Sequence, residues 1–538
     1  MAGRWDRAFE GASLARLEGL LPAYLRARRW FGGKGRRIRS AEVSDLIQVP
    51  AVDGERWRAV APAGVMLLVR VEYTEGDPET YMMPFTVEPP EAGEAGSLAP
   101  LLAILATDEG ELRLVDAMGL PAFGRALLRT IAHRRRLPGR TGSANAWGSP
   151  GFRREGLDAS TMTEPTLVGA EQTNTSLLFG DRFILKCFRR VADGMNPDLE
   201  IGEYLTERAG FRHVPAVAGA IEYRRGSEPS TLAVLHRYVP NEGDAWGYTL
   251  DALDHYLEVA ATHPRRELTA ATDGRRPLDL VGETPPLLAQ ETIGSYLEQA
   301  RLLGERTAEL HLAMASASDP AFAPEPFTPL AQRSVYQGMR NSVRRSFRLV
   351  RPLAPGHADV AAVLAREAEI LERFRALLDV RISATRIRIH GDYHLGQVLY
   401  TGRDFVVIDF EGEPARPVSE RRLKRSSLQD VAGMLRSFRY AASTALAGTR
   451  SPRPAPRTSL SPWADFWYRW VAASFLGSYL SVADGASFVP DSRLELEVLL
   501  DVFMLGKAVY ELQYEANHRP DWIGVPAHHM LELLGARS

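Results

Sequence analysis

The sequence has a single cysteine, Cys187, in its 538 residues. One thiol excludes an internal disulfide framework and a cysteine-rich zinc site. Neither sign of charge is in excess, because 65 Lys and Arg stand against 67 Asp and Glu, for a formal net charge of −2. That balance gives no support for a protein that holds nucleic acid by bulk positive charge. Hydrophobic residues at 45% provide material for a large core, and the length predicts about three or four structural units.

Long hydrophobic runs are also missing. Five charged residues between Arg4 and Arg16 interrupt any apolar core of the signal-peptide type. The longest mostly apolar stretches, residues 98–107 and 470–483, are too short or too rich in Ser and Gly to cross a bilayer. We therefore expect a cytoplasmic protein without a membrane segment.

The hydrophobic pattern predicts a β-rich N-terminal half and a mostly helical C-terminal half, with helical periodicity prevailing beyond about residue 245. We expect three parts, residues 1–125, 126–240 and 241–538. Two stretches rich in Pro, Gly, Ser and Arg, residues 133–160 and 446–462, predict exposed loops. Their basic clusters could bind an acidic partner, but a solvated loop is the preferred interpretation.

One segment, residues 387–414, carries the chemistry. It follows a strand, loop, strand, turn, strand pattern that would bring the polar ends of its loops together. Asp392 and Gln397 lie five positions apart, the spacing of the base and the metal-binding amide in the catalytic loop of kinases. Asp409 follows the next strand, where kinases carry a metal-binding aspartate. The spacing predicts a phosphoryl-transfer site.

These residue types suit that reaction, which needs an in-line acceptor hydroxyl and cations that neutralise phosphate charge. The oxygens of Asp409 and Gln397 are ligands that Mg²⁺ prefers. Asp392 would accept a hydrogen bond from the attacking hydroxyl and take its proton late. His390 and His394 do not indicate zinc, because no Glu follows His390 and the context is not helical. We expect His390 to brace the loop through a backbone hydrogen bond.

A nucleotide platform is predicted upstream, on a hairpin over residues 175–188 with Gly180 and Asp181 at the turn. Lys186 lies on its second strand, where a lysine would reach the α- and β-phosphates of ATP. Residues 169–176 offer backbone N–H groups and small hydroxyls to phosphate. The residues assigned to this role are Gln172, Thr173, Asn174, Thr175 and Ser176.

A helix beginning after Asn196 and Pro197 should supply the carboxylate that pairs with Lys186, and Glu200 is preferred over Glu203. Cys187 should point to the opposite face of its strand as a buried small hydrophobe. An apolar strand then runs into a polar turn, which predicts a hinge. Its adenine contacts are assigned to His236, Tyr238 and Val239.

Seven segments resemble bacterial maltokinases, especially the form fused to trehalose synthase. The resemblance extends from about Trp30 to Trp522, and the H-G-D-x-H-x-x-Q and D-F-E-G-E-P motifs are its most specific parts. The segments are RRWFGGKGR, EGDPETYMMPF, EQTNTSLLFGDRFILKCFRR, NPDLEIGEYLTERAGF, HGDYHLGQVLY, DFEGEPARPVSERRLKRSSLQDVAGMLRSF and GKAVYELQYEANHRPDW.

The resemblance implies an α+β fold of the eukaryotic-protein-kinase-like, aminoglycoside-phosphotransferase type. In that fold a β-rich N-terminal cap subdomain (1–125) precedes a kinase N-lobe (126–240) and a mostly helical C-lobe (241–538). The implied activity is ATP- and Mg²⁺-dependent phosphorylation of maltose at the anomeric hydroxyl, giving maltose 1-phosphate for α-glucan and glycogen synthesis. The sequence contains no trehalose synthase module, so we expect such a partner to be a separate chain.

Matching positions give Asp392 the role of base, Gln397 and Asp409 that of metal ligands, and Lys186 that of ATP contact. Lys507 and Tyr510 fall in the family's K-A-x-Y-E motif, which is implicated in sugar contact, and their spacing puts them on one face of an expected helix. The residues assigned to the substrate are His390, Glu411, Arg416, Lys507 and Tyr510.

Other interpretations stay open. A related sugar kinase such as glucosamine kinase would share the ATP machinery and differ in its sugar pocket. A nucleotide-binding pseudokinase that scaffolds trehalose synthase would usually have lost a catalytic residue. An aminoglycoside-resistance kinase is disfavoured, because its cationic substrates call for an acidic site and the run from Arg416 to Arg425 is basic. That run fits a solvated face equally well.

Overall fold

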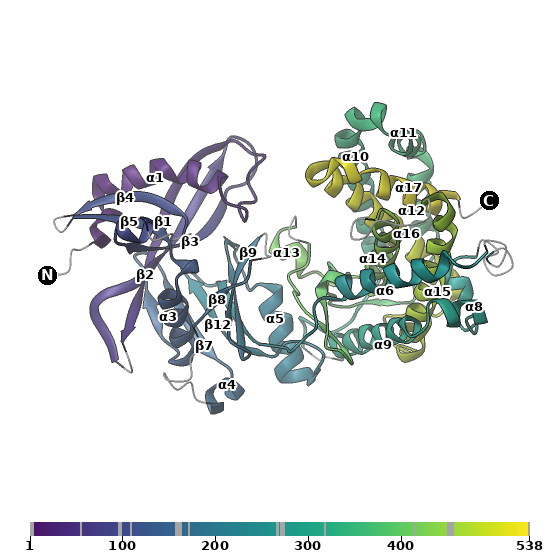
Figure 1. Ribbon diagram of the computed structural model, residues 1–538, viewed down its shortest axis with the longest axis horizontal. Coiled ribbons are helices and arrows are strands. Elements are labelled where there is room, and N and C mark those ends of the chain that lie inside the picture. Colours follow the sequence, from purple (N-terminus) through teal and green to yellow (C-terminus); the bar gives the residue numbers. More distant parts are fainter. Residues whose placement is uncertain are drawn as a thin grey trace. The chain divides into compact units, whose positions relative to one another are not determined.

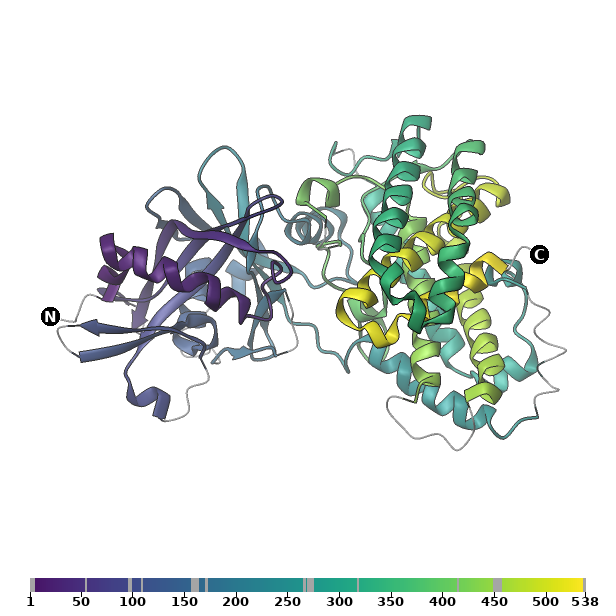
Figure 2. The same cartoon turned by 90° about the horizontal axis from the view of Figure 1, so that it is seen from above.

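The computed structural model divides into two compact units (Figures 1 and 2). The N-terminal unit comprises Met1–Thr206, Pro215–Pro240 and Ala415–Glu420, and the C-terminal unit the remainder. The structure describes residues 5–53, 56–94, 99–107, 110–155, 164–169, 173–264, 268, 275–316, 319–413, 416–448 and 457–535.

The first sheet of the N-terminal unit is antiparallel and has the order β1-β2-β3-β5-β4, with the short β11 paired to β3. Helix α1 (Gly11–Arg26) lies against it, because Leu17, Leu21 and Leu25 recur every four residues and are all buried. The strands are β1 (Ile38–Asp53), β2 (Arg56–Tyr73), β3 (Glu79–Glu88), β4 (Leu101–Thr107), β5 (Gly110–Asp116) and β11 (Arg190–Val191).

The second sheet has the order β6-β7-β12-β13-β10-β9-β8. Helix α3 (Pro121–Ala132) contributes Phe123, Leu127 and Ile131 to the core that this sheet covers. The strands are β6 (Arg136–Pro138), β7 (Ser143–Gly148), β8 (Thr166–Leu167), β9 (Asn174–Phe179), β10 (Phe183–Phe188), β12 (Val217–Arg224) and β13 (Pro229–Arg237), and the further helices are α2 (Glu91–Glu94), α4 (Pro150–Glu155) and α5 (Pro197–Glu203).

The expected loop over residues 133–160 is wrong for most of its length. Strands β6 and β7 and helix α4 occupy it as far as residue 155, and residues 156–160 lie outside the described ranges. The basic and Gly-rich composition of this stretch is typical of a loop, but the stretch contains short strands that bury small side chains. Ala144 and Ala146 of β7 are buried where that strand pairs with β12.

The C-terminal unit is mostly helical, as predicted. A small hairpin of β16 and β17 connects the loop that contains Asp392 and Gln397 to the loop that contains Asp409. Helix α15 packs against α9 and buries Trp463 and Trp467. The elements are α6 (Ala245–Ala260), α8 (Leu287–Thr292), α9 (Tyr296–Ala315), β14 (Glu325–Pro326), α10 (Pro329–Val350), α11 (Ala358–Ala365), α12 (Glu367–Asp379), β15 (Thr385–Arg386), β16 (Val398–Tyr400), β17 (Phe405–Val407), α14 (Leu428–Leu446), α15 (Arg457–Val482), α16 (Arg493–His518) and α17 (Gly524–Gly535), while α13 (Val418–Arg421) straddles the two units.

The expected loop over residues 446–462 is also wrong in part. Helix α15 begins at Arg457 and includes Pro462, while residues 449–456 lie outside the described ranges. Pro462 is the sixth residue of this helix, so it removes one backbone hydrogen bond near the helix start. The Pro- and Ser-rich stretch therefore contains the start of a helix.

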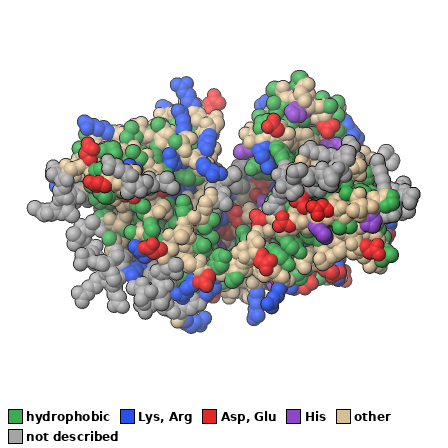
Figure 3. Space-filling model, in the orientation of Figure 1, with side chains coloured by type: hydrophobic (Ala, Val, Ile, Leu, Met, Phe, Trp, Pro, Cys, Tyr) green, Lys and Arg blue, Asp and Glu red, His purple; other side chains and the backbone are tan. Residues whose placement is uncertain are grey.

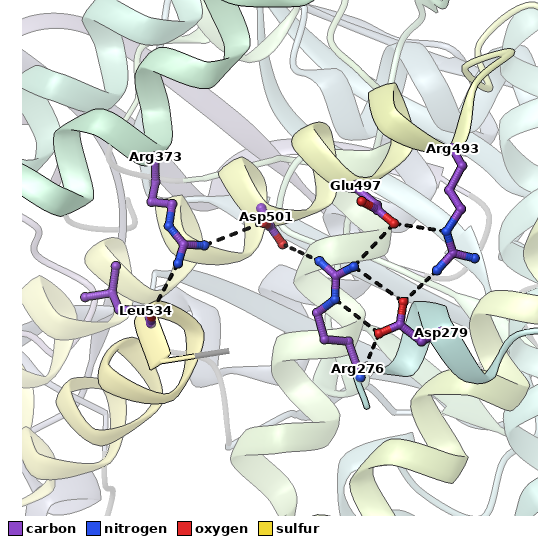
Figure 4. Close-up of polar contacts among 7 residues, drawn as sticks. All are labelled: Arg276, Asp279, Arg373, Arg493, Glu497, Asp501 and Leu534. Atoms are coloured by element: carbon purple, nitrogen blue, oxygen red, sulfur yellow. Dashed lines mark hydrogen bonds and ion pairs between the residues drawn. The ribbon is translucent and has the colours of Figure 1, made fainter. Parts of the chain in front are cut away.

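An ion-pair network fixes the first half of α16 (Figure 4). The Arg276 guanidinium reaches Glu497 at 3.3 Å and Asp501 at 3.9 Å, both on α16. Arg373 of α12 lies 3.7 Å from the carboxylate of Asp501. The same guanidinium donates a hydrogen bond to the Leu534 carbonyl of α17 at 3.0 Å. This half of the helix is thereby tied to three neighbouring segments.

The surface of the C-terminal unit bears acidic side chains over α6 (Figure 3), where Asp251 and Glu258 are exposed. Within the described ranges, no helix combines the length and the apolar character needed to cross a bilayer.

Candidate active site

The catalytic loop predicted at residues 390–397 lies in the C-terminal unit and ends in a short 3₁₀ turn, Leu395–Gln397, before β16. The His394 ring accepts a hydrogen bond from the Gly396 N–H at 3.1 Å and so caps that turn. Gly391 has φ +84°, and a Cβ there would stand 3.5 Å from the Cα of Gly412. That distance leaves room for a Cβ, so it is the positive φ of this position that favours glycine.

His390 braces the loop, as predicted. It is 1% exposed, and its Nε2 lies 2.9 Å from the Ile408 carbonyl oxygen while its Nδ1 accepts a hydrogen bond from the Asp392 N–H at 3.3 Å. Both ring nitrogens are engaged within the protein. Its assignment to the substrate is therefore corrected, because a histidine bonded in this way positions the base instead of contacting a sugar.

A second brace, Asp430 of α14, was missed in the sequence. Its buried carboxylate accepts hydrogen bonds from the His390 N–H at 2.7 Å and the Gly391 N–H at 2.9 Å. The Nε2 of His311 lies 3.3 Å from Oδ2, the oxygen that also accepts the His390 N–H. The signal available in the sequence was an acidic residue among the apolar residues in the first turns of a helix, because a buried carboxylate needs a partner.

The two predicted metal ligands lie side by side. The Gln397 Nε2 donates a hydrogen bond to Oδ2 of Asp409 at 3.1 Å. The Asp409 backbone has φ +66°, a conformation that costs a non-glycine residue about 1–3 kcal/mol. The preceding Ile408 is held at its N–H by the Gln397 carbonyl and at its carbonyl by His390. A carboxylate and an amide oxygen fit Mg²⁺, which takes its other ligands from water and phosphate.

The predicted base, Asp392, forms an ion pair with Lys507 of α16, whose Nζ lies 2.9 Å from Oδ1. Burial would raise the pKa of this carboxyl, but the Lys507 ammonium and two nearby histidines outweigh that effect and lower the pKa to about 2. Burial disfavours the Lys507 charge, yet Asp392 and Glu413 raise its pKa above the usual value. Asp392 is therefore an ionised hydrogen-bond acceptor at neutral pH.

Tyr510 accompanies Lys507 on the same face of α16, as their spacing predicted. The Lys507 ammonium lies 4.8 Å from the centre of the Tyr510 ring. Burial, followed by the charge of Asp392, raises the pKa of the Tyr510 hydroxyl to about 12, so this group stays a neutral donor. The K-A-x-Y-E motif therefore lies next to the predicted base Asp392, and Lys507 is the residue of the motif that pairs with it.

The remaining substrate assignments are placed as follows. Glu411 lies 3.7 Å from the Arg421 guanidinium, which also donates to the Glu411 carbonyl at 2.9 Å. Arg416 belongs to the N-terminal unit and pairs with Glu420 at 3.8 Å. Lys424 of the same basic run pairs with Glu325 at 3.0 Å. Ion pairs therefore engage much of the basic run, and sugar contact by the first two residues stays a prediction.

The C-terminal unit also contains a row of half-buried aromatic rings that sequence reasoning missed. Tyr440 of α14 lies 6.1 Å from Trp246 of α6 and 6.4 Å from Trp522, with the second pair nearly parallel. Helix α6 packs against the 3₁₀ turn of the catalytic loop. The Tyr440 hydroxyl donates to Glu515 of α16 at 2.8 Å. Flat aromatic faces next to carboxylates are surfaces on which sugar rings stack and hydrogen-bond.

In the N-terminal unit, Lys186 lies on β10 of the predicted hairpin, and Gly180 takes φ +58° at its turn. Its Nζ lies 3.2 Å from Oδ2 of Asp198, which is 2% exposed. Asp198 is thus a carboxylate partner of Lys186 that sequence reasoning missed, and the preference for Glu200 over Glu203 stays a prediction. Asn196 caps α5 by accepting a hydrogen bond from the Asp198 N–H at 2.9 Å, and this cap directs the first-turn carboxylate toward the strand.

The predicted phosphate-contacting stretch divides between the two faces of a strand, because residues 174–179 form β9. Ser176 pairs with Lys186 across the hairpin and shares its face. Thr175 lies on the opposite face with Cys187, and its hydroxyl accepts a hydrogen bond from Arg189 at 2.8 Å. Its assignment to phosphate is corrected for that reason.

The other members of the nucleotide set are placed in part. Thr173 is exposed and Asn174 half-buried, whereas Gln172 lies outside the described residues. His236, on β13, lies 3.7 Å from the Asp198 carboxylate. The Tyr238 N–H donates to the Arg182 carbonyl at 2.9 Å. Contacts of His236, Tyr238 and Val239 with adenine stay predictions.

Two family models match separate parts of the chain. Residues 24–119 match the model described as maltokinase N-terminal cap domain, and residues 284–412 match the phosphotransferase enzyme family. The second match includes Asp392, Gln397 and Asp409. The two matches support a maltokinase-like kinase with the fold of this phosphotransferase family. As such, the kinase transfers phosphate to a hydroxyl group.

Curated relatives and solved structures agree with this fold. The kinase is 26% identical to a glucosamine kinase of Streptacidiphilus jiangxiensis over 70% of this chain and 75% of the relative. It is 26% identical to a glucosamine kinase of Mycolicibacterium smegmatis over 67% and 77%. A solved glucosamine kinase in complex with glucosamine, ADP and inorganic phosphate has a TM-score of 0.60 at 19% identity, covering 91% of this chain and 95% of that structure.

Proposed function

We propose that this kinase phosphorylates maltose with ATP at the anomeric hydroxyl and forms maltose 1-phosphate. The observation that carries the proposal is the maltokinase-type cap at residues 24–119. The contact of the K-A-x-Y-E motif with the base, through Lys507 and Asp392, supports it. The half-buried aromatic row of Trp246, Tyr440 and Trp522 also supports it, because sugar rings stack on aromatic side chains.

In this proposal Asp392 accepts a hydrogen bond from the anomeric hydroxyl while that oxygen bonds to the γ-phosphorus of ATP and the bond to ADP breaks. A carboxylate whose pKa is lowered to about 2 is a weak base, so the proton moves late. The anomeric hydroxyl suits a weak base, since it is more acidic than the other sugar hydroxyls. Gln397 and Asp409 would hold Mg²⁺, which neutralises phosphate charge when bound.

Glucosamine is the second candidate acceptor, because the curated relatives are glucosamine kinases. Electrostatics alone do not separate the two sugars, because Lys507 is paired with Asp392 and lies near Glu413. Glucosamine carries an ammonium group, and the ammonium of Lys507 lies 2.9 Å from the base that must accept the hydroxyl. Like charges in one pocket repel unless carboxylates intervene. A pseudokinase is disfavoured, since Lys186, Asp392, Gln397 and Asp409 are all present.

A sugar panel tests the proposal. The full chain is incubated with ATP, Mg²⁺ and maltose, glucose or glucosamine, ADP release is followed, and the phosphate position is mapped by ³¹P and ¹H NMR. We expect the highest kcat/KM with maltose and a product phosphorylated at the reducing-end anomeric oxygen. Asp392→Asn serves as the inactive control. A 6-phosphate product or a preference for glucosamine would replace this proposal with the second candidate.

The cellular setting is a further part of the proposal. We place the kinase in the cytoplasm, where maltose 1-phosphate feeds α-glucan and glycogen synthesis, and propose trehalose synthase as a separate partner chain. Mixing the two purified chains in analytical ultracentrifugation tests the partner, because a complex sediments faster than either chain. Two independent sedimenting species would contradict it.

A further inference from the structure

The carboxylate of Asp392 is only half engaged by the protein. Lys507 donates to its Oδ1 at 2.9 Å. Among the residues that the structure describes, no donor reaches Oδ2. The Asp392 side chain is 19% exposed and that of Lys507 18%. One oxygen of the base is therefore held from inside, and the other is available to a ligand.

We propose that Lys507 is a positioning residue for the catalytic base: it holds Oδ1 of Asp392 so that Oδ2 is presented to the acceptor hydroxyl. The role rests on the proposed function only in that Asp392 is the base, and it does not depend on which sugar is phosphorylated. Between His390 and Gln397 the catalytic loop contains no Lys or Arg. A cation for the base must therefore come from another element, and α16 supplies it.

The ammonium of Lys507 is well fixed for this task. The first half of α16 is tied to its neighbours by the network of Arg276, Glu497 and Asp501 (Figure 4). Beyond that network on the same helix, the Tyr510 ring lies 4.8 Å from the Lys507 Nζ. A long side chain on a fixed helix, with its ammonium beside an aromatic ring, loses little further freedom when it binds the carboxylate.

The charge of Lys507 also decides whether Asp392 can act. Burial raises the pKa of this carboxyl, and Lys507 is the largest of the opposing influences, ahead of His394 and His390. The other groups facing the pair are Glu413 and Tyr510, and neither adds positive charge. Without the ammonium the desolvation remains, so the carboxyl takes up a proton at higher pH. A protonated carboxyl cannot accept the proton of the acceptor.

The test compares Lys507→Met, Lys507→Arg and Tyr510→Phe in the full chain. Methionine keeps the length of the lysine stem without its charge, arginine restores a donor, and the phenylalanine variant changes the same helix face without altering the cation. Steady-state kinetics are measured with the best acceptor of the sugar panel. We expect Lys507→Met to lower kcat about tenfold or more with little change in the sugar KM, and Lys507→Arg to recover part of that loss. Tyr510→Phe should change the sugar KM alone.

A measurement independent of turnover separates this inference from the proposed function. The protein is labelled with [4-¹³C]aspartate, and the Asp392 carboxyl signal is assigned by its loss in Asp392→Asn. We expect the signal to titrate at clearly higher pH in Lys507→Met than in the unmodified protein and in Tyr510→Phe. An unchanged titration, or a raised sugar KM with unchanged kcat, would show that Lys507 is a sugar ligand only. Failure of every sugar in the panel would refute the proposed function, and the carboxyl titration would then decide the role of Lys507 by itself.

Discussion

Replacing Asp430 by asparagine probes how the C-terminal unit holds its catalytic loop. The carboxylate accepts hydrogen bonds from the N–H groups of His390 and Gly391 at 2.7 and 2.9 Å, one on each oxygen. Asparagine keeps the shape but retains only one acceptor oxygen, and its NH₂ group faces a donor. A hydrogen bond to a charged group is worth about 1.5–3 kcal/mol, so we expect roughly 2–3 kcal/mol less stability.

The same change should reduce turnover. Freeing one of these two N–H groups lets the loop shift, and a displacement of about 1 Å at the reacting groups can cost about 10²-fold in rate. We expect kcat to fall by about that factor in Asp430→Asn, with the ATP dissociation constant largely unchanged. Urea denaturation measures the stability, steady-state kinetics the turnover, and fluorescence titration the nucleotide affinity.

The matched control is Asp116→Asn in the N-terminal unit. Asp116 is also buried, accepts a hydrogen bond from the Met118 N–H at 2.9 Å and pairs with Arg189 at 3.0 Å. Its replacement should cost similar stability and leave kcat unchanged well below the unfolding temperature. If Asp430→Asn loses stability but keeps the kcat of the unmodified protein, the loop does not depend on this brace and the role given to Asp430 is wrong.

Three further predictions concern the two sites. Asp392→Asn keeps the size of the base but cannot take a proton, so kcat should fall about 10²–10⁴-fold with unchanged ATP affinity, and near-normal turnover would disprove the base assignment. Asp198→Asn removes the charge beside Lys186 and should raise the KM for ATP more than the sugar KM. A larger rise of the sugar KM would contradict the assignment of Lys186 to ATP. The pKa of Asp392 is lowered from 3.8 to about 2, so its ion pair stabilises the fold above about pH 4 and that stability is lost as the pH falls toward 2. Between about pH 5 and 8, protonation of Asp392 should therefore cause no decrease of kcat/KM at the acidic end. A decrease that disappears in Asp392→Asn would contradict the lowered pKa.

Local pattern determined the parts of this protein that depend on short-range chemistry. The hairpin of β9 and β10, the long helices α9 and α16, and the β-rich and helical halves follow from periodicity and turn residues near one another in the chain. The spacing of Asp392, Gln397 and Asp409 was equally readable, because one hairpin and the loops at its ends carry all three. Period-two alternation also placed Cys187 in the core on the face opposite Lys186.

Tertiary packing decided which side chains from distant segments meet. Asp430 and Lys507 reach the catalytic loop from helices 40 and 115 positions away, and no local pattern specifies such a contact. The ion pair of Lys186 with Asp198 depended on the cap of α5, which no spacing in the sequence indicated. The motif assigned Lys507 to sugar contact and gave no sign of its pairing with the base. The fold places its ammonium against Asp392, because a buried carboxylate and a buried cation are each costly unless they are paired.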